Sequence, residues 1–186
     1  MNATKMARRR PLALDPARRF AIKRNVHEWV IGAEAQRFAQ AFADVLGTPG
    51  ARFGAIEVQR LPGRDGQPFA VGERFAGCVK LPHLPFSRWL EDNLFSDYAE
   101  MVEMTPLRVV YRYLSGCPMA GTSTFEVQPL GDRCRLRVIF EHQEVGGFAV
   151  TILHRFGIRM HDRVTQAQVE AAAARLSAPI LSSTLE

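Results

Sequence analysis

Three side chains occupy positions from which they could do chemistry together: His142, Tyr111 and Tyr113. Each belongs to a stretch in which apolar and charged residues alternate, and each falls on the apolar side of that alternation. An imidazole titrates near neutrality, so His142 with a tyrosine could position a carbonyl or hydroxyl group of a ligand, or move a proton. The alternative is that His142 lies at the end of a strand, solvated or hydrogen-bonded to the backbone.

Glu73 is a further candidate, as a general base. It shares one side of a predicted strand with Phe75 and Val79, and burial there would raise the pKa of its carboxyl group. The alternative is a solvated Glu73 at the start of that strand.

Neither a metal site nor a reactive thiol is predicted. His154 and His161 lie two turns apart on a predicted helix, which separates them by about 10 Å, too far to share one ion. We expect both on the solvated face of the helix. The chain has three cysteines, Cys78, Cys117 and Cys134, and none is in a C-x-x-C motif. The odd number and the spacing indicate reduced, structural thiols. Hydrolase, NTPase and dinucleotide-binding patterns do not occur, so we expect no cofactor.

The composition predicts one folded, cytoplasmic domain. The chain has 186 residues, of which 47% are hydrophobic and 23% charged, as in ordinary well-packed soluble domains. No apolar run approaches the roughly 20 residues that span a bilayer. We therefore expect no membrane span.

The net charge of +5 is concentrated at the N-terminus. Residues 1–24 contain eight Lys or Arg and one Asp, whereas acidic residues slightly outnumber basic ones in the remainder. The domain itself therefore lacks a basic character, and no specific nucleic-acid partner is expected. Residues 1–19 are predicted to be a solvated, disordered arm; alternatively, this arm binds an acidic partner.

Residue patterns predict a series of strands followed by one long helix. Aromatic and β-branched residues indicate a first strand at residues 20–31. Phe38, Phe42 and Val45 are at helical spacing and indicate a short helix at residues 32–45. Further strands are predicted at residues 53–61, 69–81, 98–104, 107–114, 122–129 and 133–145.

The last predicted helix, at residues 147–176, carries one long apolar stripe. Its members are Phe148, Ile152, Phe156, Met160, Val164, Ala167, Ala171 and Ala174. The predicted sheet also has one apolar face, because Cys134, Leu136, Val138, Phe140 and His142 alternate with charged residues. An antiparallel sheet of about six or seven strands buries both surfaces only by curling around the helix. We therefore predict an α+β fold, with residues 177–186 as a frayed tail.

The sequence resembles the START-like or SRPBCC superfamily over residues 20–176. The patterns that carry the resemblance are VIGA at residues 30–33, VGERF at 71–75, MTPLRVVYR at 104–112 and TFEVQPLG at 124–131. The resemblance implies a helix-grip fold with a deep cavity for lipids, polyketides or other apolar molecules. Two features depart from a minimal member: the basic arm and residues 82–97. Residues 82–97 could form a lid carrying Trp89, or instead a surface helix that packs Trp89 on the domain.

We expect this domain to bind a small hydrophobic or aromatic ligand. The resemblance also allows a cyclase or dehydratase acting on a polyketide-like substrate, and the basic arm allows an interaction module. An exposed edge strand would permit a homodimer. The predicted cavity is lined by Phe75, Val79, Trp89, Tyr111, Tyr113, Phe125, Phe140, His142, Phe148, Ile152, Phe156 and Met160.

Overall fold

The computed structural model describes residues 6, 8–48, 52–53, 56–60, 70–79, 96–117, 119–145 and 148–185. The side chains of residues 47, 79, 96, 148–160 and 185 lie outside this description.

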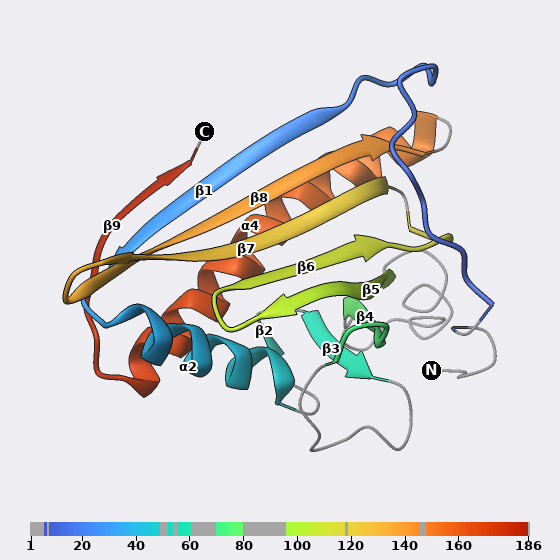
Figure 1. The fold of residues 1–186 in the computed structure, drawn as a ribbon. Helices are drawn as coiled ribbons and strands as arrows, with labels where there is room; N and C mark the ends of the chain where they lie inside the picture. The colour runs from blue at the N-terminus through green and yellow to red at the C-terminus, as the bar shows by residue number, and fades with distance from the viewer. Residues whose placement is uncertain are drawn as a thin grey trace, which may run out of the picture.

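A single antiparallel sheet dominates the fold (Figure 1). Within the described ranges it has nine strands, in the order β2-β3-β4-β5-β6-β7-β8-β1-β9, which is more than the six or seven predicted. The strands are β1 (Lys23–Ile31), β2 (Arg52–Phe53), β3 (Ile56–Arg60), β4 (Arg74–Val79), β5 (Ser96–Thr105), β6 (Arg108–Tyr113), β7 (Met119–Leu130), β8 (Arg133–Glu144) and β9 (Ile180–Leu185).

The extra strands arise at the two edges of the sheet. The sequence predicted one strand at residues 53–61, and the structure has β2 and β3 there. The prediction of a frayed C-terminal tail was wrong for Ile180–Leu185, which pair with β1 along its free edge. The backbone N–H of Gly32 donates to the carbonyl of Pro179 at 2.9 Å and holds the approach to this strand.

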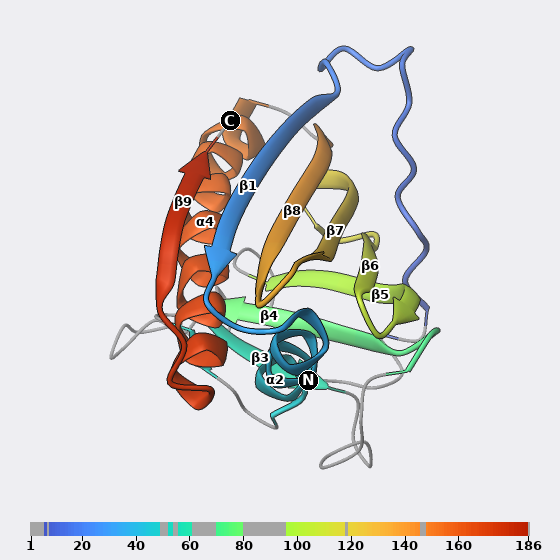
Figure 2. The same ribbon diagram turned by 60° about the vertical axis from the view of Figure 1, so that its left-hand side comes forward.

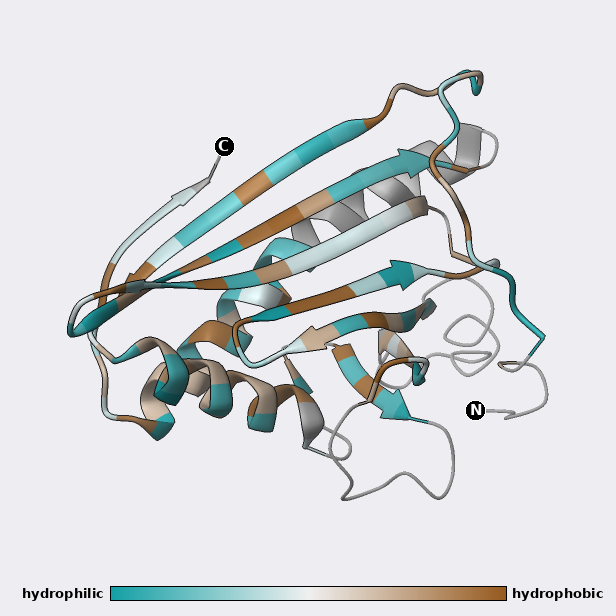
Figure 3. Ribbon diagram, viewed as in Figure 1, coloured by the Kyte–Doolittle hydropathy of each residue, from teal (hydrophilic) through white to brown (hydrophobic). Residues whose placement is uncertain are grey.

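Two helices, α2 (Ala35–Gly47) and α4 (Phe148–Arg175), pack against one face of the sheet and against each other. The sheet curls around α4, and strand direction changes strongly between β1 and β4 (Figure 2). Figure 3 shows hydrophobic and hydrophilic stretches along the strands. Burial alternates residue by residue along most of β7 and β8, as expected of strands with one buried face. The predicted helix-grip fold is confirmed.

From residue 161 to the end of α4, the part whose side chains are described, the buried face is shifted by about one residue from the predicted stripe. Ala174 is exposed, whereas its neighbour Ala173 is buried together with Val169. Thr165 is also buried, and its hydroxyl donates to the carbonyl of His161 at 2.9 Å. The stripe was misplaced because this polar residue satisfies its own hydrogen bond within the helix and can therefore face the sheet.

The buried hydrophobic residues form two clusters. The helix cluster joins α2 and the C-terminal part of α4 to β1, β7 and β8; it includes Trp29, Ile31, Phe38, Phe42, Phe125, Leu136, Val138 and Val169. The arm cluster joins Met6 of the N-terminal arm to residues of β4, β5, β6, β7 and β8 and of the loop after β6; it consists of Met6, Ala76, Cys78, Tyr98, Tyr113, Leu114, Cys117, Met119 and Phe140. Tyr111 packs against both clusters and therefore marks where they meet.

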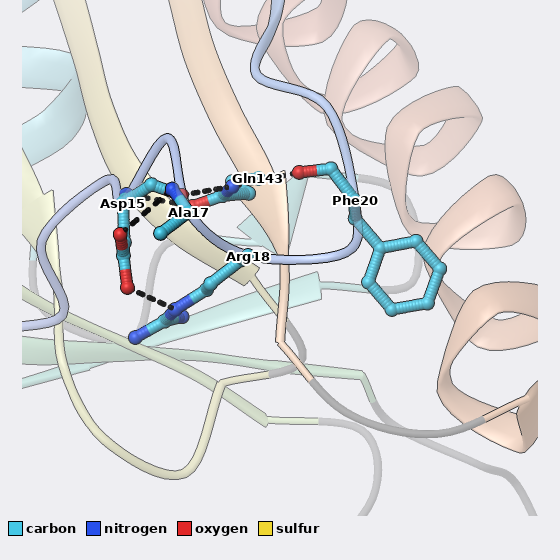
Figure 4. Close-up of polar contacts among 5 residues, drawn as sticks. All are labelled: Asp15, Ala17, Arg18, Phe20 and Gln143. Carbon is cyan, nitrogen blue, oxygen red and sulfur yellow. Dashed lines mark hydrogen bonds and ion pairs between the residues drawn. The ribbon is translucent and has the colours of Figure 1, made fainter.

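The N-terminal arm differs from its prediction, because residues 8–20 pack on the protein. Leu12 donates its backbone N–H to the carbonyl of Tyr113 at 3.0 Å, and Ser115 donates to the carbonyl of Arg10 at 2.7 Å. The buried amide of Gln143 accepts from the N–H of Asp15 and donates to the carbonyls of Asp15 and Phe20 (Figure 4). These bonds satisfy backbone groups that a solvated arm would leave to water.

No helix in the described part of the chain combines the length and apolar character that crossing a membrane requires.

Candidate functional site

A row of aromatic rings crosses the inward face of the sheet. Ring centroids lie 5.5 Å apart for Phe42 and Phe125, 5.7 Å for Phe125 and Tyr111, and 5.9 Å for Tyr111 and Tyr113. Phe140 continues the row at 5.7 Å from Tyr113. These spacings are those of favourable edge-to-face and offset aromatic pairs.

The row has a branch toward β4. The Phe75 ring lies edge-on to Tyr111, with centroids 5.4 Å apart. Phe75 and Tyr111 are only partly buried although they share a face with fully buried rings. Phe75 and Tyr111 therefore keep part of their surface accessible, unlike Phe42, Phe125, Tyr113 and Phe140.

Two imidazoles sandwich the last ring of the row. The centroids of Phe140 and His142 are 4.3 Å apart with planes inclined by 22°, and those of Phe140 and His161 are 4.5 Å apart with planes inclined by 11°. His142 is fully buried. The predicted inward position of His142 is thus confirmed, and the solvated alternative is wrong.

Ser123 joins a phenol to an imidazole. Its hydroxyl oxygen lies 3.4 Å from the Tyr113 hydroxyl and 3.4 Å from Nε2 of His161. Ser123 occupies this place because it pairs with Tyr111 on β6 and with Phe140 on β8. Two titratable side chains are therefore linked through one buried hydroxyl group.

The sequence placed His161 on the solvated face of the helix, and this was wrong. Its side chain is 16% exposed and faces β7 and β8. The position was missed because the predicted apolar stripe ran through Met160 and Val164. The spacing of His161 and Thr165, which both face the sheet, is the signal that could have revealed it.

Asp162 lies on the other side of the His161 ring. Its Oδ1 is 3.9 Å from Nδ1 of His161 and 3.2 Å from Nε2 of His27 on β1. Burial alone would raise the pKa of the Asp162 carboxyl, but hydrogen bonds and charges of the two histidines outweigh burial and hold that pKa below its usual range. Asp162 therefore stays ionised between them.

Asp97 at the start of β5 behaves in the opposite way. Burial raises the pKa of its carboxyl group to about 6, against the opposing charge of His161. Burial also raises the pKa values of Tyr111 and Tyr113. At neutral pH both phenols consequently keep their protons and can donate hydrogen bonds.

Glu73 is buried, so the solvated alternative is wrong for it as well. Its Oε1 is 2.5 Å from Nε of Arg60, and its Oε2 accepts from the backbone N–H of Ala70 at 3.2 Å. A carboxylate engaged in a buried ion pair is poorly placed to accept a substrate proton. These contacts support a structural role at the beginning of β4.

Cys117 is held by the backbone of Tyr98, which donates to its Sγ at 2.9 Å and accepts from it at 3.1 Å. Burial raises the pKa of the thiol well above its ordinary value, so it is not an activated nucleophile. Cys78 and Cys134 are also buried and free. The described side chains contain no group of three or more potential ligands that could hold a metal ion.

Several predicted lining residues cannot be compared with side-chain positions. Trp89 and residues 82–95 lie outside the described residues. The backbone of Val79 belongs to β4, and that of Phe148, Ile152, Phe156 and Met160 belongs to α4, but their side chains lie outside the description, as does that of His154.

No family model matches the sequence, and no curated protein matches it. Similar solved structures nevertheless exist. The Zhui aromatase/cyclase from Streptomyces sp. R1128 has a TM-score of 0.58 at 14% identity, covering 83% of this chain and 93% of that one. Norcoclaurine synthase from Thalictrum flavum has a TM-score of 0.56 at 16% identity, covering 89% and 95%. A conserved protein from Geobacillus kaustophilus has a TM-score of 0.54 at 10% identity, covering 88% and 99%. The aromatase/cyclase and the synthase have SRPBCC or Bet v1-like folds, and this chain shares their helix-grip architecture.

Proposed function

We propose that this protein binds a small hydrophobic or aromatic molecule between the sheet and α4. The observation that carries this proposal is the aromatic row, which remains partly exposed at Phe75 and Tyr111 on the inward face. Binding sites for small molecules are mostly apolar walls with a few polar groups that fix orientation. The row supplies such a wall, and Tyr111 and His161 supply polar groups at its centre and end.

The ligand proposed here has an aromatic ring or apolar body and one neutral oxygen substituent. Tyr111 is protonated at neutral pH and would donate a hydrogen bond to that oxygen. The apolar body would pack on Phe75 and Phe125, where each buried ring contributes on the order of 1.5–3 kcal/mol. The α4 side chains Phe148, Ile152, Phe156 and Met160, together with Val79 and Trp89, remain predicted members of the wall.

The structural neighbours support a ligand of this kind. One is described as an aromatase/cyclase, and the other was solved in complex with dopamine and hydroxybenzaldehyde. Both descriptions concern those proteins. They favour an aromatic ligand because the fold is shared.

Native mass spectrometry of protein purified from its own host tests this proposal. We expect an added mass of a small molecule in the wild type, and at least a tenfold lower bound fraction in Tyr111→Ala, because that change removes both ring and hydroxyl. Arg112→Ala is the matched control, since it changes the neighbouring residue of β6, which faces away from the row. Protein without added mass, and with equal affinity of both variants for phenolic ligands, would contradict the proposal.

A cyclase or dehydratase is the second candidate, and the Tyr113, Ser123 and His161 contacts favour it. In the loss of water from a β-hydroxy ketone, His161 would take the proton next to the carbonyl group. The same proton would then join the departing hydroxyl as water, so the reaction needs no cofactor. Tyr111 would hold the carbonyl oxygen. The stacked position of His142 makes it a support for Phe140 in this scheme.

The β-hydroxy ketone formed from benzaldehyde and acetone is a suitable probe, because its dehydration product absorbs ultraviolet light. We expect His161→Ala to lower the rate by about 100-fold or more, in the range of general base catalysis. His142→Ala is expected to lower the rate far less. Equal rates for wild type and His161→Ala would rule out the proposed base, and an effect confined to His142→Ala would restore the role predicted from the sequence.

The interaction module has less support. Backbone groups of residues 8–20 form hydrogen bonds with the rest of the protein. Arg9 also stacks on Tyr98, with its guanidinium carbon 3.4 Å from the ring centroid. This leaves the arm less free to engage an acidic partner.

A further inference from the structure

Asp97 brings a carboxyl group to the inward face of the sheet, beside the aromatic row. It lies two residues before Ala99 on β5, so both side chains point to the same face. Ala99 pairs with Phe75 on β4 and with Tyr113 on β6. The Asp97 side chain is therefore a diagonal neighbour of both aromatic rings.

Gly77 leaves this carboxyl group uncovered from the side of β4. It is the residue directly opposite Asp97, and it carries no side chain. The nearest atom to a Cβ built at Gly77 is Cγ2 of Ile56, at 3.5 Å, which is an ordinary contact distance, so no neighbouring atom occupies that position. Asp97 accordingly keeps part of its surface accessible, as Phe75 does.

The charge of Asp97 has no direct partner in the part of the chain that the structure describes. None of the described side chains forms a hydrogen bond or an ion pair with this carboxyl group. The positive charge of His161 favours its ionised form, but burial outweighs that charge and raises the pKa to about 6. The His161 ring contacts Ser123 through Nε2 and lies beside Asp162 through Nδ1, so both of its nitrogens face groups other than Asp97.

Two other buried or half-buried carboxylates of the interior are paired. Glu73 contacts Arg60 at 2.5 Å, and Asp162 contacts His27 at 3.2 Å. A buried carboxylate without such a partner is costly, and an added cation would offset that cost. Asp97 therefore differs from both in offering a negative charge that a ligand could neutralise.

We propose that Asp97 binds the ammonium group of an aromatic amine whose ring packs on Phe75 and Tyr111. The inference rests on the proposed ligand-binding function and adds a cationic group to that ligand. The aromatic rings beside Asp97 would strengthen the preference, because the face of an aromatic ring attracts a cation. A neutral ligand of the same shape would leave the carboxylate unpaired.

Tyramine and tyrosol are matched probes, since they differ only in carrying an ammonium or a hydroxyl group at the end of the same side chain. Titration calorimetry on the full chain at about pH 7.5 measures both affinities, because a carboxyl group with a pKa of about 6 is ionised there. We expect wild type to bind tyramine at least about tenfold more tightly than tyrosol. Asp97→Asn should bring this ratio to about one and leave the tyrosol affinity within about twofold of wild type.

Glu100→Gln is the matched control. Glu100 belongs to the same strand, but it faces the opposite side of the sheet, where it contacts Arg74 and Arg112. This change removes one carboxylate charge without altering the inward face, so the ratio should stay at the wild-type value.

Three outcomes separate this inference from the proposed function. Equal affinities of wild type for tyramine and tyrosol, or an unchanged ratio in Asp97→Asn, would overturn the inference while binding of tyrosol leaves the proposed function intact. An equal loss of the ratio in Glu100→Gln would assign the preference to net charge and would also overturn the inference. If neither compound binds to wild type, the proposed function and the inference fail together.

Discussion

The helix cluster is assembled from regular elements that pack side by side, whereas the arm cluster depends on a segment that crosses the ends of strands. In the helix cluster, Phe38 and Phe42 of α2 meet Val169 of α4 over the sheet. The arm cluster contains Met6 of the N-terminal arm together with strand residues such as Tyr98 and Tyr113. The first cluster is apolar throughout its centre, and the second adjoins Ser123, His161 and Asp97. The difference teaches that one part of the interior is completed by regular elements alone, whereas the other needs a segment distant in sequence to complete it.

Removing a large ring from the helix cluster should produce the largest effect on stability. Phe38 is fully buried, so Phe38→Ala is expected to lower the free energy of unfolding by about 3–5 kcal/mol. Urea unfolding followed by circular dichroism measures this. Arg37→Ala, at the exposed neighbouring position of α2, is the control and should change stability by less than about 0.5 kcal/mol. A similar loss in both variants would show that burial of the Phe38 ring is not what stabilises this region.

Asp97 should make stability depend on pH in the region of the arm cluster. Its pKa of about 6 lies above the ordinary value of 3.8, so the folded protein holds this proton more tightly than the unfolded chain. Stability should therefore rise as pH falls from about 7 to about 4, by at most about 3 kcal/mol. Asp97→Asn should be more stable than wild type at pH near 7 and equal to it near pH 4.

The pH dependence of Asp97 is separable from that of Asp162. The pKa of Asp162 is lowered in the folded state, so its contribution is present above the unfolded value and is lost only at lower pH. Urea unfolding across this range distinguishes the two residues. A wild-type profile that matches that of Asp97→Asn at every pH would show that Asp97 is not the group responsible.

Loosening the arm alone should have the smallest of these effects. Gln143→Ala removes three hydrogen bonds to Asp15 and Phe20, and we expect a loss of about 1–3 kcal/mol. Hydrogen exchange should accelerate in residues 9–20 but not in α2. The control is Gln166→Ala, which removes the acceptor of the Trp29 indole in the helix cluster and should leave exchange in the arm unchanged. Faster exchange throughout the chain after Gln143→Ala would mean that the two clusters unfold together.

The sequence predicted well those elements whose evidence is local. Phe38, Phe42 and Val45 at helical spacing predicted α2, and all three are buried. Alternation from Cys134 to His142 predicted β8 and its inward face. In both elements the apolar residues recur with the period of the backbone, that of a helix in α2 and that of a strand in β8.

The elements that were mispredicted depend on partners distant in sequence. The segment Ile180–Leu185 has a weak strand pattern of its own and becomes β9 because β1 offers an unpaired edge. The arm is rich in arginine, which indicates a solvated segment, yet Arg74 and Gln143 bind its carbonyl groups. Every residue except proline carries the same backbone donor and acceptor, so the pattern of side chains does not indicate which backbone groups will pair.

The candidate site was predicted only in part, because some of its residues follow a local pattern and others depend on partners distant in sequence. Tyr111 and His142 lie on strands with clear alternation, so their inward placement could be inferred. His161 and Asp162 are polar neighbours on a helix, and only the position of Ser123 and His27 on the opposing strands reveals their roles.

The anchoring of the arm also bears on the order in which the protein acquires its structure. The arm is synthesised first, but Asp15 binds a residue 128 positions later and Arg9 one 106 positions later. A nascent chain therefore carries an undocked N-terminus until β8 has left the ribosome, and closing such a large loop adds to the entropy that folding must overcome. During that interval the backbone groups of Tyr113, Ser115 and Gly121 that the arm later engages stay open to water.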